Sequence, residues 1–182
     1  MPPKQRITRE MILKSAFAMF CSQGMEVVNA RSVAKALGCS TQPIFSYFTG
    51  MQELKDALDQ KAQELYAEKV TTLPESENWL VDVCDAHVRF ACAYPHVYAH
   101  LCAAVRADLT RLGAYSALFA ALIAHVQQKE HVSEDVAHKV VDEVGIYANG
   151  VINRLLIKGV DNIDVGGRIA AAYDVILASQ KK

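Results

Sequence analysis

Residues 29–48, NARSVAKALGCSTQPIFSYF, carry the signals of two short helices separated by a tight turn. Asparagine is a favoured N-cap residue, so Asn29 predicts that a helix starts just after it. Glycine is the residue that most often follows the last turn of a helix, so Gly38 predicts where this helix ends. Ser40 predicts the cap of the next helix. Pro43 then falls at the third helical position, where its missing N–H has no intrahelical partner to lose. Two short helices joined by such a turn form a helix-turn-helix.

The second helix of this pair has an apolar side and a polar side. Ile44 and Phe48 are four residues apart and are expected to face inward. The residues expected to face outward are Thr41, Gln42, Phe45 and Ser46. In a helix-turn-helix the outward face of the second helix can read DNA bases. Gln42 can form two hydrogen bonds with adenine N6 and N7, and the methyl group of Thr41 can touch a thymine methyl. The alternative is an ordinary solvated helix face.

The rest of the chain has the period of helices and little strand-like alternation. Thr8 predicts the cap of a first helix, whose apolar stripe is Ile12, Leu13, Ala16, Phe17 and Phe20. Further helices are predicted over 30–37, 51–72, 78–93, 96–107, 114–130, 133–157 and 164–179, the last two capped by Ser133 and Asp164. The fold class is therefore all-α, with an N-terminal three-helix DNA-binding domain of the helix-turn-helix type over 1–54 and a helical domain over 55–182.

The composition is that of a globular protein, with 52% hydrophobic and 21% charged residues. The net charge of −1 hides an asymmetry, because residues 1–55 hold seven basic and three acidic residues, whereas the remainder holds 12 and 17. A basic N-terminal segment favours a polyanionic partner, although chance variation gives the same imbalance. No membrane span and no secretory signal are predicted. Five cysteines without a CxxC pair indicate reduced thiols and a cytoplasmic protein.

The segment GMEVVNARSVAKALGCSTQPIFSYFTGMQEL, residues 24–54, resembles the DNA-binding segment of the tetracycline-repressor (TetR) family, as does the helix pattern ILKSAFAMF before it. The resemblance covers roughly the first 50 residues. It implies a sequence-specific transcriptional regulator, a homodimeric repressor released from its operator by a small, mostly apolar ligand. The DNA-binding residues it implies, together with nearby basic residues, are Arg6, Asn29, Arg31, Ser40, Thr41, Gln42, Pro43, Phe45, Ser46, Tyr47 and Lys55.

Two positions depart from the family pattern. Phe45 replaces a tyrosine that commonly donates to a phosphate, and Met51 replaces a lysine that commonly follows the recognition helix. A hydrogen bond to a charged group contributes about 1.5–3 kcal/mol, so we expect weaker phosphate anchoring. Arg6, Arg9 and Lys55 can offset that loss, or Tyr47 can turn outward and supply the missing hydroxyl.

The resemblance implies that the C-terminal body binds the small-molecule effector. Candidate lining residues in the central helices are His87, Phe90, Tyr94, Tyr98, Cys102, Phe119, Tyr147 and Asn149. Apolar walls with a few polar groups suit a mostly apolar ligand. For any one of these residues, ordinary core packing is the alternative.

The sequence gives less support to metal binding or catalysis. Cys92, His96 and His100 have helical spacing, with Cys84 and His87 upstream, but Pro95 interrupts the helix between them, so no metal site is predicted. The chain has no glycine-rich phosphate loop, GxSxG elbow or HExxH motif, so we predict no enzyme activity and no cofactor. The alternatives are a small helical enzyme or a protein-binding adaptor with an unrecognised site.

The last two predicted helices carry broad apolar faces. The residues assigned to a dimer interface are Val136, Val140, Val144, Val151, Leu155, Ile169, Tyr173 and Ile176. Paired across a two-fold axis, the faces would form a four-helix bundle. The alternative is that both faces pack inside one subunit.

Overall fold

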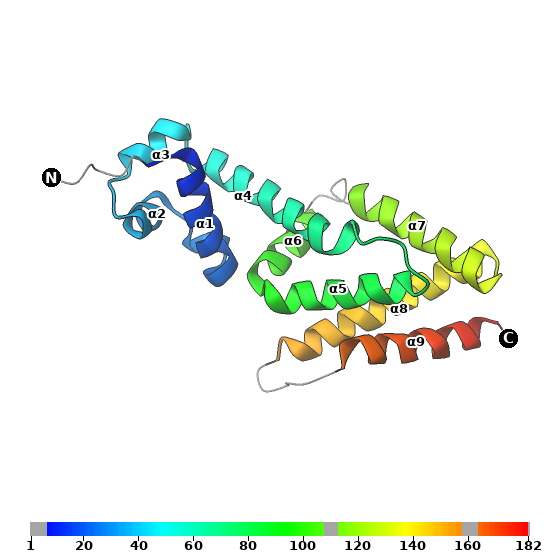
Figure 1. Cartoon of the computed structure of the whole chain (residues 1–182). Coiled ribbons are helices and arrows are strands. Elements are labelled where there is room, and N and C mark those ends of the chain that lie inside the picture. Colours follow the sequence, from blue (N-terminus) through cyan, green and yellow to red (C-terminus); the bar gives the residue numbers. More distant parts are fainter. Residues whose placement is uncertain (1–6, 108–112, 158–163, 182) are drawn as a thin grey trace. The chain divides into compact units, whose positions relative to one another are not determined.

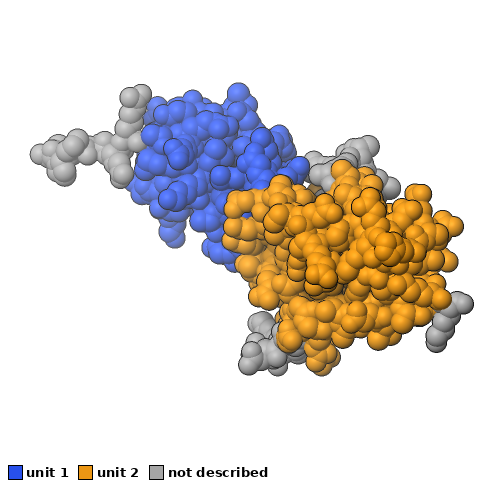
Figure 2. All heavy atoms as spheres, turned by 45° about the vertical axis from the view of Figure 1, so that its right-hand side comes forward, with its two compact units in different colours: residues 1–65, 96–103 blue, residues 66–95, 104–182 orange. Residues whose placement is uncertain are grey.

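A computed structural model describes residues 7–107, 113–157 and 164–181, and every regular element in these ranges is a helix (Figure 1). The chain forms two compact units, coloured separately in Figure 2. Unit 1 comprises residues 1–65 and 96–103, and unit 2 comprises 66–95 and 104–182. The domain division predicted after residue 54 differs from this one, in which unit 1 continues to residue 65.

Unit 1 contains the helix-turn-helix. Its helices are α1 (Arg9–Gln23), the short 3-10 helix η1 (Met25–Val27), α2 (Ala30–Leu37), α3 (Gln42–Tyr47) and α4 (Met51–Tyr66). α1 packs against η1, α2 and α3. The fully buried side chains of these helices include Ile12, Phe20, Val33, Ile44, Leu54 and Leu58. The apolar stripe predicted for the first helix is confirmed at its centre, where Ile12, Ala16 and Phe20 are fully buried.

The turn between α2 and α3 has the geometry expected for a glycine C-cap. Gly38 has φ 64° and ψ 32°, in the left-handed region. The N–H of Cys39 donates to the Ala34 carbonyl at 3.0 Å and that of Gly38 to the Lys35 carbonyl at 3.2 Å. This pair of bonds is a Schellman motif, which satisfies two carbonyls at the end of α2.

The predicted cap of the recognition helix is wrong by one residue. The N-cap is Thr41, not Ser40, and its side chain makes no capping hydrogen bond. Its carbonyl instead accepts from the N–H groups of Ile44 and Phe45. Pro43 is therefore at the second helical position rather than the third. The proline is accommodated there for the predicted reason, since an N–H in the first turn has no intrahelical acceptor.

The cap predicted at Asn29 is confirmed. Asn29 Oδ1 accepts from the N–H groups of Arg31 at 3.1 Å and Ser32 at 3.0 Å, and Ser32 Oγ accepts from the Asn29 N–H at 3.0 Å. We predict that Asn29→Ala lowers the free energy of unfolding by about 1 kcal/mol, because these donors lose their acceptor. Urea denaturation followed by circular dichroism measures the loss, and Asn29→Asp should keep most of the stability. Equal losses in both variants would contradict the capping role.

Unit 2 is a helical bundle. Its helices are the π-helical turn η2 (Ala67–Thr71), α5 (Trp79–Ala93), α7 (Gly113–Glu130), α8 (Glu134–Leu155) and α9 (Val165–Gln180). α6 (Pro95–Ala107) has its middle in unit 1 and its two ends in unit 2. Figure 1 shows α8 running beside α9, and α8 also packs on α5 and α7. The caps predicted at Ser133 and Asp164 are confirmed, each accepting from a first-turn N–H.

The apolar faces of α8 and α9 pack within the chain. Of the residues assigned to a dimer interface, the five buried inside a single chain are Val140, Val144, Val151, Ile169 and Tyr173. The reason is that α8 contacts α5, α7 and α9 together, and α9 also contacts α5. In the single chain these five side chains therefore pack against its own helices. Val136, Leu155 and Ile176 are half-buried.

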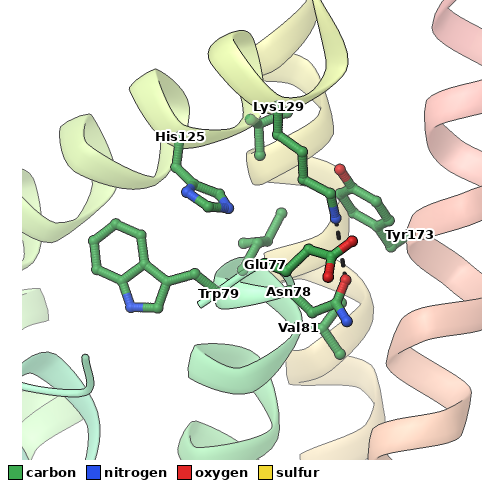
Figure 3. A pocket seen from close by; sticks show the side chains of 9 residues that line it. Glu77, Asn78, Trp79, Val81, His125, Lys129 and Tyr173 are labelled. Atoms are coloured by element: carbon green, nitrogen blue, oxygen red, sulfur yellow. Dashed lines mark hydrogen bonds between the residues drawn. The ribbon is translucent and has the colours of Figure 1, made fainter. Parts of the chain in front are cut away.

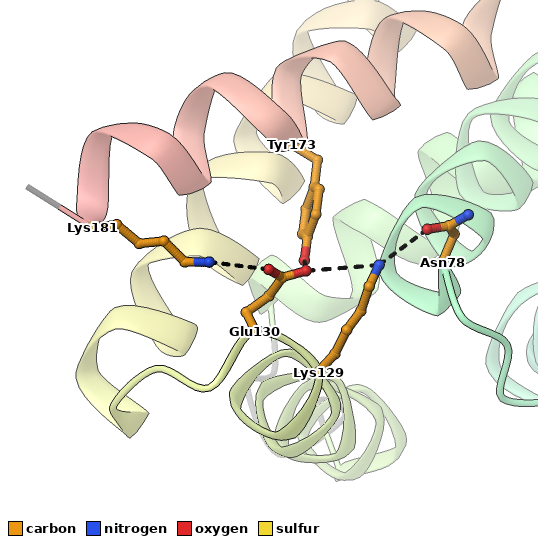
Figure 4. Close-up of polar contacts among 5 residues, drawn as sticks. All are labelled: Asn78, Lys129, Glu130, Tyr173 and Lys181. Carbon is orange, nitrogen blue, oxygen red and sulfur yellow. Dashed lines mark hydrogen bonds and ion pairs between the residues drawn. The ribbon is translucent and has the colours of Figure 1, made fainter.

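A polar cluster also fixes Tyr173 inside the chain (Figure 4). Tyr173 donates to Glu130 Oε1 at 2.8 Å, and Lys181 Nζ donates to Glu130 Oε2 at 3.2 Å. Lys129 Nζ lies 3.8 Å from Glu130 and donates to Asn78 Oδ1 at 3.1 Å. Burial acts to raise the pKa of Glu130. The hydrogen bonds from Tyr173 and Lys181, together with the charges of Lys181 and Lys129, outweigh burial, so the net shift of the pKa is downward. The ionised carboxylate joins the ends of α7 and α9.

Candidate functional site

The outer surface of α3 is exposed although the helix is anchored in the core. Ile44 is 0% exposed and Phe48 1%, whereas Phe45 is 52% exposed. Gln42 and Ser46 are exposed beside Phe45, and Thr41 is half-buried. The predicted inward and outward faces are therefore confirmed. The outer surface of α3 therefore presents one aromatic ring among polar side chains.

The basic residues considered for DNA contact differ in their exposure and contacts. Arg31 and Lys35 on α2 are exposed. The Arg9 guanidinium lies 4.9 Å from the centre of the Phe48 ring, and Lys55 is half-buried. Arg6 lies outside the described residues.

Two further polar residues of this surface have intramolecular partners. The Tyr47 hydroxyl donates to the Ile7 carbonyl at 3.3 Å, although the side chain is 38% exposed. The Asn29 amide donates to the Val27 carbonyl at 3.2 Å, in addition to its capping role. Tyr47 therefore stands on the surface with its hydroxyl turned to the backbone ahead of α1.

Unit 2 contains a cavity of about 570 Å³. Its lining residues are Tyr66, Val83, Cys84, His87, Ser116, Leu118, Phe119, Ala120, Leu122, Ile123, Gly145, Ala148 and Asn149. They come from the end of α4 and from α5, α7 and α8. The volume is within the range of about 300–1,000 Å³ that is usual for small-molecule sites.

The cavity includes three of the eight predicted ligand residues, namely His87, Phe119 and Asn149. Phe90 and Tyr94 are not among the described lining residues. The Phe90 ring is edge-on to the Tyr66 ring, with centroids 5.0 Å apart, and tilted against the Tyr94 ring, with centroids 5.3 Å apart. Tyr147 is 37% exposed at the surface. Tyr98 and Cys102 belong to unit 1.

Sequence reasoning missed most of the cavity wall, although periodic signals were present. Tyr66 continues the i, i+4 series of buried residues along α4 from Leu54 through Leu58 and Ala62. On α7, Leu118, Phe119, Leu122 and Ile123 form one stripe. A stripe shows that a helix face is covered, but the pattern does not distinguish a tightly packed face from one that leaves a cavity.

A neutral hydrogen-bonded cluster lies in the cavity wall. The Tyr66 hydroxyl and His87 Nδ1 are 2.8 Å apart, and His87 also hydrogen-bonds the Asn149 side chain. Burial lowers the pKa of His87, against the smaller opposing effect of the Asn149 hydrogen bond. Burial raises the pKa of the Cys84 thiol to about 12. Both side chains are therefore uncharged at neutral pH.

The lowered pKa of His87 predicts a pH-dependent stability. Because the unfolded chain binds this proton more readily than the folded one, the stabilisation is present above pH 6.5 and is lost as the pH falls below it. The loss can reach about 1.4 kcal/mol per pH unit. Urea denaturation of the wild type and His87→Gln at pH 7.5 and 5.5 measures it. The wild type should lose more stability than the variant, and identical pH dependence would contradict the prediction.

A second hollow in unit 2 is too small for a ligand. It has a volume of about 10 Å³ and lies among Trp79, His125, Lys129 and Tyr173 (Figure 3). The Trp79 and His125 rings meet edge-on at 5.7 Å, and His125 Nδ1 is 2.9 Å from Glu75 Oε1. A space of this size holds one water molecule.

The predicted absence of a metal site concerns the histidines and cysteines of α5 and α6. Over residues 7–107, 113–157 and 164–181, no group of three or more His, Cys, Asp or Glu side chains is placed to hold a metal ion. His100 Nε2 instead contacts Asp59 Oδ1 at 2.8 Å. None of the described helices combines the length and apolarity needed to cross a bilayer.

Buried anchors, a Schellman turn and an exposed recognition face define an N-terminal helix-turn-helix on a helical body, the architecture of a DNA-binding transcriptional regulator. Residues 12–58 match the family model described as bacterial regulatory proteins, tetR family. The match covers the helix-turn-helix of unit 1 and none of unit 2. The family model describes regulatory proteins, so the match favours a regulator over the small helical enzyme considered above.

Solved structures share the fold over nearly the whole chain. The TetR family regulator PfmR from Thermus thermophilus is 17% identical, with a TM-score of 0.60, and the match covers 92% of this chain and 97% of that one. A TetR-like regulator from Rhodococcus sp. RHA1 is 15% identical, with a TM-score of 0.58 and 97% of each chain covered. A TetR variant from Acinetobacter baumannii AYE, solved in complex with minocycline, is 15% identical, with a TM-score of 0.54 and 97% of each covered. No curated protein matches the sequence.

Proposed function

We propose that this regulator is a homodimeric, cytoplasmic repressor that leaves its operator when a small, mostly apolar molecule occupies the cavity of unit 2. The observation that carries the proposal is the exposed face of α3, held by the buried Ile44 and Phe48. A ligand shifts a protein between two states only by binding one of them better. The cavity provides a site at which such a difference in affinity can arise.

In this proposal α3 lies in the major groove and Gln42 reads a base. Gln42 is exposed, and its amide can bond adenine N6 and N7 together, while the Thr41 methyl can touch a thymine. Phe45 and Ser46 lie on the same exposed surface, and Arg31 provides a cation for a phosphate.

We predict that Gln42→Ala relaxes the preferred operator at one base pair of each half-site. The loss of bidentate base recognition corresponds to about 1–3 kcal/mol of discrimination. Binding-site selection from random duplexes measures the change. The matched control is Gln60→Ala on α4, where the Gln60 amide already donates to Glu64 at 2.9 Å. An unchanged consensus for Gln42→Ala would remove Gln42 from the reading surface.

The dimer brings two such heads to a palindromic site, with half-sites at least one DNA turn apart, about 34 Å. Because the core-facing residues of α8 and α9 are occupied, the proposed contact uses the apolar side chains that remain exposed. These are Ile146, Tyr147, Leu156, Ile157 and Val175. A hydrodynamic mass near the 20.0 kDa of one chain would contradict the dimer.

The repressor function is tested on the DNA just upstream of the protein's own gene. The purified protein should retard this duplex and not an unrelated one, and a metabolite that fits the cavity should restore the free DNA. A metabolite that strengthens the complex would indicate a co-repressor and contradict release. Absence of retardation at low ionic strength, with the protein folded, would contradict the DNA-binding role.

A further inference from the structure

Over the residues that the structure describes, the wall of the 570 Å³ cavity has no charged side chain. Among the described residues that line it, none is Asp, Glu, Lys or Arg. Moving an ionised group from water into an apolar site costs several kcal/mol unless an opposite charge meets it there. A carboxylate or an ammonium group would therefore lose hydration in this cavity without gaining an ionic partner.

The polar groups of the wall are uncharged and lie together. Tyr66 and His87 are in contact at 2.8 Å, and His87 is bonded to Asn149. Ser116 adds a hydroxyl to the lining. The Asn149 amide also donates to the Gly145 carbonyl at 3.0 Å. A hydroxyl and a carboxamide can each both donate and accept, so Tyr66 and Asn149 are the kinds of group that recognise a neutral polar group.

Apart from the Cys84 thiol, the rest of the lining is aliphatic or aromatic. Val83 on α5 and the stripe of Leu118, Leu122 and Ile123 on α7 offer only carbon atoms. These surfaces favour a ligand whose body is hydrocarbon, since apolar area removed from water contributes about 25 cal/mol per Å².

We propose that the effector is an electrically neutral molecule with a hydrocarbon body and a single hydrogen-bonding group, such as a hydroxyl or carbonyl, that meets the Tyr66–His87–Asn149 cluster. The inference rests on the proposed use of this cavity as the effector site. It excludes fatty acids in their ionised form and protonated amines as the preferred ligands.

The test compares three probes with the same ten-carbon chain: decan-1-ol, decanoate and decylammonium. Isothermal titration calorimetry on the full-length protein at pH 7.5, below the aggregation concentration of each probe, gives the three dissociation constants. The alcohol should bind at least 10-fold more tightly than either ion, because a tenfold ratio corresponds to only about 1.4 kcal/mol of the desolvation penalty. Equal or tighter binding of an ion would overturn the proposal, and so would the absence of binding by the alcohol.

A pair of variants locates the polar end of the bound alcohol. Asn149→Ala should weaken alcohol binding about 3–10-fold, the size expected for one neutral hydrogen bond. The control is Asn153→Ala one turn along α8, where Asn153 is exposed and donates to the Asn149 carbonyl at 3.1 Å. Asn153→Ala should bind as the wild type does. Equal weakening in both variants would overturn the assignment of the cluster.

The calorimetry contains no DNA, so its outcome is independent of the repressor assay. A protein that prefers the alcohol but ignores every duplex would retain the cavity inference and lose the proposed function. A protein that binds its operator but prefers an ion would retain DNA binding and lose the neutral effector.

Discussion

Replacing Phe48 with alanine is expected to lower the free energy of unfolding of unit 1 by about 3–5 kcal/mol. The Phe48 side chain is 1% exposed and follows directly after α3, and the Arg9 guanidinium covers one face of its ring. Truncation would remove a large buried surface and leave a cavity under the recognition helix. Because this loss is a large share of the stability of a typical domain, α3 should also lose its fixed position.

The matched variant is Phe45→Ala, three positions earlier, on α3 itself. Its side chain is 52% exposed, so the same chemical change should cost less than about 0.5 kcal/mol. Urea denaturation followed by circular dichroism at 222 nm suits both variants. Fluorescence does not, since the single tryptophan, Trp79, belongs to unit 2. Equal losses in the two variants would contradict the division of α3 into a buried and an exposed face.

The affinity for operator DNA is expected to fall about 10³-fold or more between 50 and 200 mM salt. Neutralised phosphates release condensed counterions, and the logarithmic slope is about −0.9 per contact. A symmetric dimer with three or four contacts in each head reaches this loss. The excess of basic residues in positions 1–55 supplies the cations, although Phe45 and Met51 offer none of the phosphate contacts common in the family.

Arg31→Ala tests where the slope originates. Arg31 is exposed in the first turn of α2, and its removal should flatten the slope by about 0.9 for each phosphate that its guanidinium neutralises. Arg89→Ala is the control, because Arg89 is exposed in unit 2 and pairs with Asp85. Fluorescence anisotropy with a labelled operator at several salt concentrations measures both. A wild-type slope for Arg31→Ala would place the phosphate contacts elsewhere.

Local signals along the chain predicted the helices well. Thr8, Asn29, Ser133 and Asp164 each cap the predicted helix, because a cap needs only a side-chain oxygen within three residues of a free N–H. Ser40 fails by the same criterion: α3 starts one residue later, after a turn whose path depends on how Ile44 and Phe48 reach the core.

The sequence by itself determined that the chain is helical, where its helices begin, and which face of the recognition helix is exposed. These properties follow from capping and from the 3.6-residue period, which act within one element. The tertiary structure alone decided that Val140 and Tyr173 pack inside the chain, and that Tyr66 and His87 meet across a cavity. Periodicity shows that a face is covered, but the partner of that face depends on how residues far apart in the chain pack together.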